Sequence, residues 1–267
     1  MEFRGIDVSK WNGNIDWDKV KNSGISFAMI REGWGKKSPT QIDKKFKDNI
    51  NGAKNAGVHA GVYHYCYADS VEDAINEAQF CLENIQGISL DYPIVIDIED
   101  KEQLKLNNYQ RTEIVKAFCN EVEKAGYYAM FYCNLNWLNN YFYKEQLIHK
   151  YDLWLAQWNV GSPSESCGIW QYSSTGKING IEGNVDLDIA YKDYPSIIKS
   201  GGLNKFEKSQ SANQEPQYTM YFVKKGDSLW NIAKEKLGNG ARWVEIRDLN
   251  KLSSETIYPN QTLKIPK

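Results

Sequence analysis

Three stretches of the chain place carboxylates at the ends of apolar runs: GIDVSKWNG near the N-terminus, IVIDIED at 94–100 and NVDLDIAY at 184–191. In the second stretch Asp97 and Glu99 are one residue apart, so on a strand both carboxylates point to the same face. Neighbouring carboxylates repel each other, which separates their pKa values and lets one stay protonated while the other is ionised. Glycoside hydrolysis uses such a pair. The competing interpretation of one such stretch alone is a solvated strand end.

Eight apolar runs can supply strands that position these acids. They are 3–8, 26–33, 60–67, 93–99, 128–134, 153–158, 168–173 and 185–191. Amphipathic segments at 43–55, 70–84 and 109–125 predict helices between several of them. Nearly continuous apolar strands with helical crossovers predict a parallel sheet buried on both faces, and eight of them predict an α/β fold, an irregular TIM-like (β/α) barrel. The connections 159–167 and 174–184 are short and polar, so we expect the second half of the barrel to be irregular.

Catalytic groups in such barrels lie at the carboxyl ends of the strands. Acids from the first, fourth and eighth runs can therefore meet at one mouth, and the predicted catalytic residues are Asp7, Asp97, Glu99 and Asp186. Aromatic side chains near the same strand ends could stack on sugar rings, although such residues also fill barrel interiors. The predicted substrate-binding residues of the barrel are Tyr63, Tyr132, Trp154, Gln157, Trp158 and Trp170. His64 is expected to be structural, and without a His/Cys cluster the sequence predicts neither a metal nor a cofactor.

Charge divides unevenly along the chain. Residues 218–267 hold nine basic and five acidic residues, which gives them a formal charge of +4. Because the whole chain carries −2, residues 1–217 must carry −6. This asymmetry predicts two modules with different tasks. The basic module suits an anionic surface such as a Gram-positive wall. Nucleic acid is disfavoured as a partner because the basic residues alternate with acidic ones.

The five cysteines are odd in number and widely spaced without a CxxC motif, so we expect reduced, mostly buried thiols. No apolar run approaches the roughly 18 residues of a membrane span, so no membrane insertion is expected. The first ten residues, MEFRGIDVSK, lack the apolar core of a signal peptide. We therefore expect the protein to accumulate in the bacterial cytoplasm. To reach the cell wall it would need another agent that releases it. The sequence does not predict an oligomeric state.

A change in composition marks a domain boundary. Residues 199–217 are rich in Gly, Ser, Asn and Gln, which predicts a flexible linker between a barrel at 1–198 and a second domain at 218–267. The second domain has a βααβ pattern, with Asp227 or Ser228 as the cap of its first helix. Met220 could serve as an internal translation start.

The segment of about 1–195 resembles glycoside hydrolase family 25. The resemblance is carried by GIDVSKWNG, Tyr63-His64-Tyr65, IDIED, LWLAQW, WQYSS and Val185-Asp186. It implies an incomplete (β/α) barrel that cleaves the β-1,4 bond between N-acetylmuramic acid and N-acetylglucosamine, as in phage endolysins and bacterial autolysins. By position in the motifs, Glu99 corresponds to the general acid, Asp97 to the carboxylate beside it, and Asp7 and Asp186 to further acids of the site.

The C-terminal segment resembles a LysM domain through YFVKKGDSLWNIAKEKLG, WVEIRDLN and IYPNQTLKIP. The resemblance implies an α+β (βααβ) domain that binds peptidoglycan or chitin between two loops. The residues that would form this groove are Gly226, Asp227, Ser228, Leu229, Ile257, Tyr258, Pro259 and Asn260. We expect Trp230 to be a core residue rather than part of the groove.

Several alternatives stay open at this point. The positive charge that develops on the sugar could be met by a carboxylate, by water activated by Asp7 or Asp186, or by the substrate's own acetamido oxygen. The protein could be an endolysin that lyses a host bacterium, a bacterial autolysin, or an inactive barrel that only binds glycan. A chitinase of the large DxxDxDxE family is disfavoured because residues 92–99 read YPIVIDIE.

Overall fold

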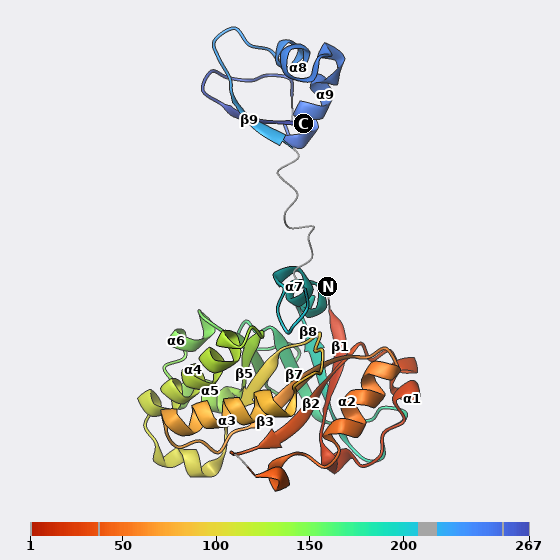
Figure 1. Cartoon of the computed structure of the whole chain (residues 1–267), viewed down its shortest axis with the longest axis vertical. Helices are drawn as coiled ribbons and strands as arrows, with labels where there is room; N and C mark the ends of the chain where they lie inside the picture. The colour runs from red at the N-terminus through yellow and green to blue at the C-terminus, as the bar shows by residue number, and fades with distance from the viewer. Residues whose placement is uncertain (1, 37, 208–217, 253, 267) are drawn as a thin grey trace. The chain divides into compact units, whose positions relative to one another are not determined.

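The computed structural model describes residues 2–36, 38–207, 218–252 and 254–266 (Figure 1). The described residues fall into two compact units, one before and one after residues 208–217. The expected linker 199–217 therefore lies partly outside the described residues, and each unit is considered by itself.

Eight strands close the N-terminal unit into a barrel in sequential order, and all eight expected strands are present. They are β1 (Phe3–Val8), β2 (Phe27–Trp34), β3 (His59–Tyr65), β4 (Ile94–Asp97), β5 (Ala129–Asn134), β6 (Asp152–Ala156), β7 (Ile169–Gly176) and β8 (Val185–Ala190). The predicted α/β barrel is confirmed.

The prediction of a purely parallel sheet is wrong for the last strand of the barrel. Neighbouring strands from β1 to β7 are parallel, whereas β8 is antiparallel to both β7 and β1. The connection 177–184 is too short for a helical crossover, so the chain turns back directly. As a result the beginning of β8 lies at the barrel end where β1 finishes, and Asp186 pairs in register with Asp7.

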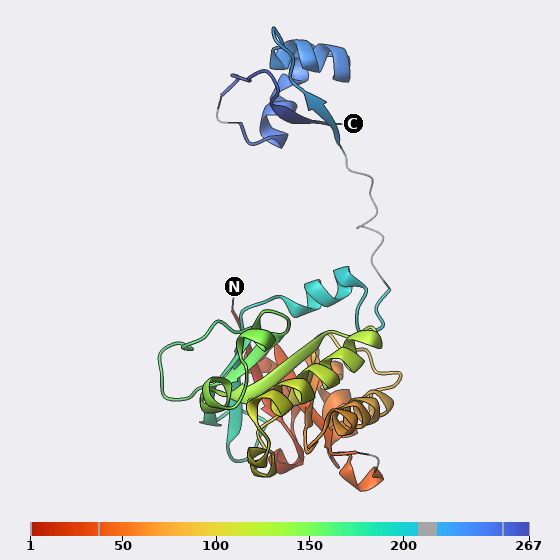
Figure 2. The same ribbon diagram turned by 90° about the vertical axis from the view of Figure 1, so that its left-hand side faces the viewer.

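Helices cover the outside of the barrel. They are α1 (Trp17–Asn22), α2 (Phe46–Asn55), α3 (Val71–Asn84), α4 (Asn108–Lys124), α5 (Leu135–Asn140), α6 (Glu145–Ile148) and α7 (Tyr194–Gly201), with short 3-10 turns η1 (Lys10–Asn12), η2 (Pro39–Gln41) and η3 (Lys101–Lys105). Helices α3 and α4 pack side by side (Figure 2). The three predicted helices correspond to α2, α3 and α4, and the connections after β6 and β7 are irregular as expected.

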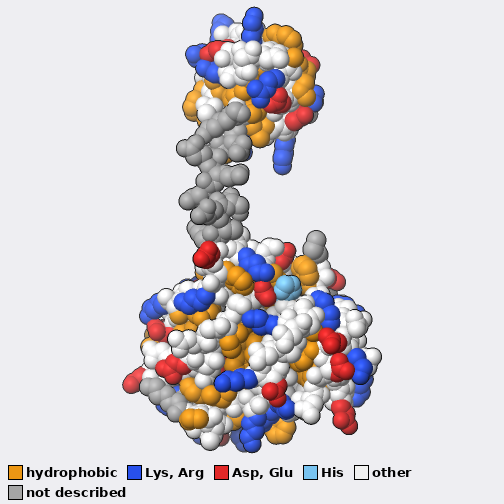
Figure 3. Space-filling model, turned by 45° about the vertical axis from the view of Figure 1, so that its right-hand side comes forward, with side chains coloured by type: hydrophobic (Ala, Val, Ile, Leu, Met, Phe, Trp, Pro, Cys, Tyr) orange, Lys and Arg blue, Asp and Glu red, His pale blue; other side chains and the backbone are white. Residues whose placement is uncertain are grey.

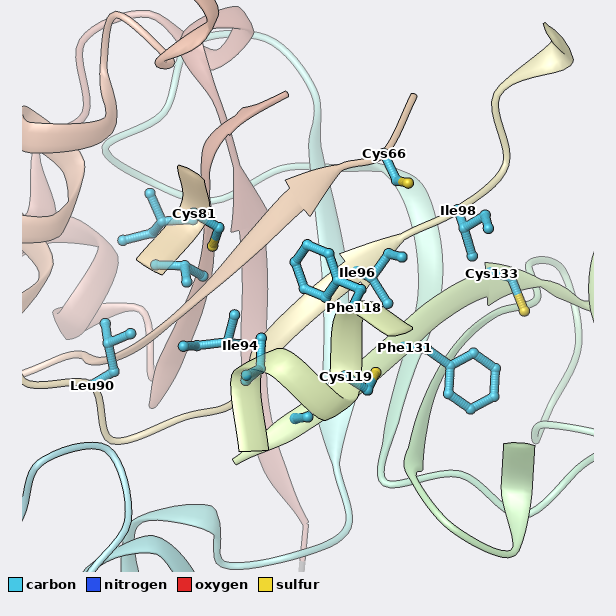
Figure 4. Close-up of a cluster of buried hydrophobic side chains, with 14 of the residues drawn as sticks. Cys66, Cys81, Leu90, Ile94, Ile96, Ile98, Phe118, Cys119, Phe131 and Cys133 are labelled. Carbon is cyan, nitrogen blue, oxygen red and sulfur yellow. The ribbon is translucent and has the colours of Figure 1, made fainter. Parts of the chain in front are cut away.

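Strand alternation divides the buried residues into two layers. One set faces the helices and includes Ile94, Ile96 and Ile98 of the β4 segment, which lie among helix residues such as Phe118 (Figure 4). The other set, which includes Val95, fills the barrel interior. Asp97 has the same parity as Val95, so the alternation directs its side chain into the barrel.

The barrel unit extends beyond the expected boundary at residue 198. Helix α7 continues to Gly201, and Leu203 and Phe206 pack against the interior cluster. Asn204 is fully buried, donates from Nδ2 to the carbonyls of Leu90 and Tyr92, and accepts from the Tyr128 amide at 2.8 Å. Residues 199–206 thus belong to the barrel rather than to a linker.

The C-terminal unit has the predicted βααβ order. It consists of β9 (Tyr218–Phe222), α8 (Leu229–Leu237), η5 (Gly240–Arg242), α9 (Trp243–Leu249) and β10 (Thr262–Pro266), with β9 and β10 antiparallel. Its core contains Val223, Leu229, Ile232, Ala233, Ile246, Leu263 and Ile265.

All five cysteines are free thiols, and four of them are buried. Among the described residues, no helix combines the length and the apolar character that crossing a membrane requires.

Candidate active site

Three of the four predicted catalytic acids line one pocket at the end of the barrel. Asp7, Asp97 and Asp186 surround a cavity of about 230 Å³. The other lining residues are Tyr63, Tyr132, Trp154, Trp158 and Gln171. Acids from β1, β4 and β8 meet here because the antiparallel β8 begins at the end where β1 and β4 finish.

Asp97 and Glu99 point to the same side of the chain although strand β4 ends at Asp97. The alternation continues past the strand, since Ile98 is fully buried in the helix-facing layer. Burial raises the pKa of Asp97 well above its usual range, and the neighbouring Glu99 raises it further. Oδ1 of Asp97 is buried and has no hydrogen-bond partner among the described residues. This oxygen is therefore available to a ligand.

Glu99 lies half-buried beside the pocket and is held by Asn134. Its Oε2 accepts hydrogen bonds from the Asn134 backbone N–H at 3.1 Å and from Nδ2 at 2.6 Å. Burial raises the pKa of Glu99, while these two bonds oppose the rise by stabilising the carboxylate. Asn134 is itself fixed, because its Oδ1 caps helix α5 by accepting from the Trp137 amide. Sequence analysis did not identify Asn134.

Gln171 was also missed, and it connects three other side chains of the site. Its Nε2 donates to Oδ2 of Asp7 at 2.7 Å, and its Oε1 accepts from the Tyr132 hydroxyl at 3.2 Å and from Trp158 Nε1 at 3.1 Å. Burial nonetheless raises the pKa of Asp7, and Asp188 and Asp186 add to the rise. Gln171 thus fixes the position of Asp7 in a strongly acidic surrounding.

Asp188 is a fifth acid of the site, and sequence analysis did not single it out. It is fully buried, its Oδ1 accepts from Trp154 Nε1 at 2.8 Å, and its Oδ2 has no hydrogen-bond partner among the described residues. Burial raises the pKa of Asp188 well above its usual range, and burial raises that of Asp186 to about 6. The alternation rule that paired Asp97 with Glu99 would have paired Asp186 with Asp188.

Two predicted substrate-binding residues lie outside the pocket. The Gln157 side chain bonds with Ser164 in the following loop, and the backbone carbonyl of Gln157 accepts from Trp170 Nε1 at 2.8 Å. Trp170 does not line the pocket, because on β7 the inward positions are Ile169 and Gln171. Trp158 is 48% exposed at the rim of the pocket and offers a ring to a ligand.

His64 lies on the helix side of the barrel wall, in an ion-pair cluster. Its Nδ1 bonds to Glu32 and its Nε2 lies 3.2 Å from Glu77, while Asn84 Nδ2 donates to Glu32 at 2.9 Å. Burial alone would lower the pKa of His64, but the two glutamates raise it to about 9. Ligand atoms of Glu32, His64 and Cys81 lie within 4.8 Å of one another. We interpret the group as a buried ion pair because both ring nitrogens of His64 already bond to glutamates, Nδ1 to Glu32 and Nε2 to Glu77.

The C-terminal loops predicted to bind glycan lie side by side at one end of the two-stranded sheet of β9 and β10. The Val223 amide donates to Gln261 and the Asn260 amide donates to Val223, which joins the segment before 226–229 to 257–261. Gly226, Ser228, Tyr258, Pro259 and Asn260 are exposed, and Asp227 and Ile257 are partly buried. Leu229 is 2% exposed and belongs to the core. Ser228 caps α8, and its Oγ accepts from the Asn231 amide.

The prediction that Trp230 is a core residue is wrong, since its side chain is 51% exposed. Helix α8 directs Leu229, Ile232 and Ala233 to the core, so Trp230 falls on the outer side. There it lies against Gly240, where a Cβ would come within 2.4 Å of the indole. Hydrophobic and basic side chains lie together on the surface of this unit (Figure 3).

Comparison with known proteins follows the division into two units. Residues 6–181 match the profile of Glycosyl hydrolases family 25. The chain belongs to this family. Residues 221–266 match the LysM domain.

Relatives of family 25 align with the barrel unit. An autolytic lysozyme from Clostridium acetobutylicum is 33% identical over 191 residues, which cover 70% of this chain and 55% of the relative. Lysozyme M1 from Streptomyces globisporus is 32% identical over 198 residues, covering 68% and 66%. The chain thus spans about half to two thirds of the length of these relatives. The solved CTP1L endolysin is 27% identical with a TM-score of 0.65, covering 74% of this chain and 70% of its own.

Proposed function

We propose that the protein is an N-acetylmuramidase that hydrolyses the β-1,4 bond between N-acetylmuramic acid and N-acetylglucosamine in bacterial peptidoglycan. The convergence of Asp7, Asp97 and Asp186 on one aromatic-lined pocket, with Glu99 next to Asp97, carries this proposal. Similarity to two proteins named lysozymes supports it. The intact set of acids disfavours an inactive glycan-binding barrel.

Glu99 is the proton donor in this account. Its burial favours the neutral acid, and Asn134 occupies only Oε2, so Oε1 can protonate the glycosidic oxygen. The proton moves to the leaving oxygen as the bond from that oxygen to the anomeric carbon breaks. The exposed ring of Trp158 stacks against a sugar at the rim.

Three routes can meet the positive charge that develops at the anomeric carbon: attack by a carboxylate, attack by activated water, and attack by the substrate's 2-acetamido oxygen. The unpartnered Oδ1 of Asp97 favours the third route, because an acetamide N–H would satisfy this buried oxygen. Asp97 would then orient the acetamido group for attack, and water would open the resulting ring. This route retains the anomeric configuration, which NMR of fresh products measures; inversion would favour activated water instead.

The C-terminal unit, in our proposal, holds the enzyme on wall glycan through the loops 226–229 and 257–260. Tyr258 is 67% exposed and presents a ring beside them. Replacing Tyr258 by Ser should weaken co-sedimentation with purified walls, whereas Tyr143→Ser on the barrel unit, a tyrosine of 48% exposure, should not. Equal binding by both variants would remove Tyr258 from the binding surface.

We further propose an endolysin role, in which the protein accumulates in the host bacterium and reaches the wall once the membrane is opened. Similarity to the CTP1L endolysin supports this setting, and similarity to an autolytic lysozyme supports the autolysin alternative. Expression in a Gram-positive host separates them. An endolysin should lyse cells only after a pore-forming agent is added, whereas an autolysin should act without one.

The bond specificity is tested by digesting purified Gram-positive peptidoglycan and reducing the products with borohydride before mass spectrometry. New reduced muramic acid ends are expected. Reduced glucosamine ends would make the enzyme a glucosaminidase, and no new ends with wall binding intact would favour the inactive barrel.

A further inference from the structure

A second aromatic groove lies beside the catalytic pocket. Lys10, Trp11, Arg31, Trp34, Tyr65 and Tyr67 line a cavity of about 300 Å³. The two cavities are adjacent: Arg31 pairs in register with Tyr63, and Tyr65 pairs with Asp97. Tyr63 and Asp97 line the catalytic pocket. A polymer that enters the catalytic pocket can therefore continue into this groove.

Hydrogen bonds fix the backbone of the loop that carries Trp11. Ser9 and Asn12 form a reciprocal cap around the turn η1, and Asn12 Nδ2 donates to the Asn184 carbonyl before β8. This turn leaves Trp11 79% exposed. Such an exposed indole on a fixed backbone is preorganised for stacking on a sugar ring, because little freedom is lost on binding.

Two cations line the groove, but they differ in their partners. The Arg31 guanidinium donates from Nε and Nη2 to Oδ2 of Asp43, at 2.9 and 2.7 Å, and is thereby neutralised. Asp43 also accepts from the Lys10 backbone amide at 3.0 Å, which ties the loop to this ion pair. The Lys10 side chain has no acidic partner among the described residues. Its Nζ lies over the rings of Trp11 and Trp34, at 4.9 and 4.6 Å from their centroids.

We infer that this groove is an extended glycan subsite, in which Trp11 stacks on a sugar and Lys10 pairs with a carboxylate carried by the strand. The inference rests on the proposed muramidase function. Every second sugar of peptidoglycan bears a lactyl group, whose carboxyl is either free or joined to a peptide stem with carboxylates of its own. Both sources present the same chemistry to Lys10, and the cation held between two indoles accepts it without displacing an existing ion pair.

The test compares steady-state hydrolysis of three soluble glycans made from one peptidoglycan preparation. The first keeps its peptide stems, the second has lost them and exposes lactyl carboxylates, and the third has those carboxylates converted to methylamides. Lys10→Met keeps the length of the side chain without its charge, and Lys10→Arg restores a cation. Lys47→Met, at an exposed lysine on α2, is the matched control.

Lys10→Met should raise KM about fivefold with little change in kcat, as the loss of a partly exposed ion pair predicts. An increase on the stem-free glycan identifies the lactyl carboxylate, and an increase confined to the stem-bearing glycan identifies the peptide. On the methylamide Lys10→Met should match the wild type, whereas Trp11→Ala should raise KM on all three. Lys10→Arg and Lys47→Met should retain the wild-type KM.

Unchanged KM for Lys10→Met on every glycan that the wild type cleaves would overturn the inference and leave the muramidase proposal standing. Failure of the wild type to cleave any of the three would overturn the proposed function and this inference with it.

Discussion

Gln171 donates a hydrogen bond to Asp7 at 2.7 Å, which joins two residues 164 positions apart in the chain. The amide cannot turn round, because its Oε1 already accepts from Tyr132 and Trp158. Asp7 thus receives an N–H whose direction is fixed by two other residues of the pocket. This donor favours the ionised form of Asp7 against the effect of burial.

Replacing Gln171 by Leu should therefore damage both stability and activity. The substitution leaves the buried carboxylate of Asp7 and the buried hydroxyl of Tyr132 without this partner, which costs about 1–3 kcal/mol of unfolding free energy for a buried group left unsatisfied. The pKa of Asp7 should rise, and kcat/KM should fall about tenfold as the pocket loses its order. Urea denaturation and hydrolysis rates measure the two effects. Gln157→Leu is the control because its side chain bonds only to Ser164; equal losses in both variants would refute this role of Gln171.

Asn134→Ala tests how the hydrogen bond from Asn134 affects the pKa of Glu99. The variant removes the Nδ2 donor to Glu99 and the cap of α5, and the latter costs about 1 kcal/mol of stability. Because the lost bond stabilised the carboxylate, the pKa of Glu99 should rise. A general acid must be protonated, so the basic limb of the pH profile of kcat should move to higher pH, by about one unit. A limb that stays in place would show that another group controls it.

The raised pKa of Asp186 should make the stability of the protein decrease as the pH rises. Burial raises its pKa to about 6, so the folded protein binds this proton more tightly than the unfolded chain. Stability from this group is fully present below about pH 4 and is lost as the pH rises through 6. Asp186→Asn should therefore gain about 1–2 kcal/mol at pH 7, after allowance for solvent screening, and nothing at pH 4. Thermal unfolding at both pH values measures this gain, and Asp18→Asn, at an exposed acid, should show none.

His64 should make stability fall with rising pH in the same direction as Asp186, but in the alkaline range. Its folded pKa of about 9 exceeds the unfolded value, so its contribution is fully present below about pH 6.5 and is lost as the pH rises through 9. The loss should amount to about 3 kcal/mol. In His64→Gln this alkaline loss should be absent, while stability at pH 6 should be lower because Glu32 and Glu77 lose their buried cation. A variant with the alkaline slope of the wild type would contradict this account.

The sequence predicted the barrel because its eight runs carry a strong apolar signal, and it predicted the acids because their spacing fits one strand face. It did not predict the direction of β8, since direction follows from whether the connection 177–184 can cross the barrel. The positions of Asp7 and Asp186 were still correctly brought together, because the reversed strand puts Asp186 opposite Asp7.

The errors within the site have a different cause. In WQYSS the sequence favoured Trp170, but only the pairing of β7 with its neighbours decides that Gln171 points inward. Asn134 could not be recognised, since its partner Glu99 is 35 residues away and lies beyond the end of a strand. Asp188, by contrast, could have been found from alternation alone.

The central claim is that Glu99 donates the proton in a muramidase, and the rate at which Glu99→Gln creates new muramic acid ends tests it most directly. Glutamine keeps the shape of the side chain and cannot supply the proton, so the rate on purified peptidoglycan should fall by about 10²–10⁴-fold. Glu102→Gln, at an acid on the exposed turn η3, should retain the wild-type rate. A Glu99→Gln enzyme that forms muramic acid ends at the rate of the wild type would contradict the account.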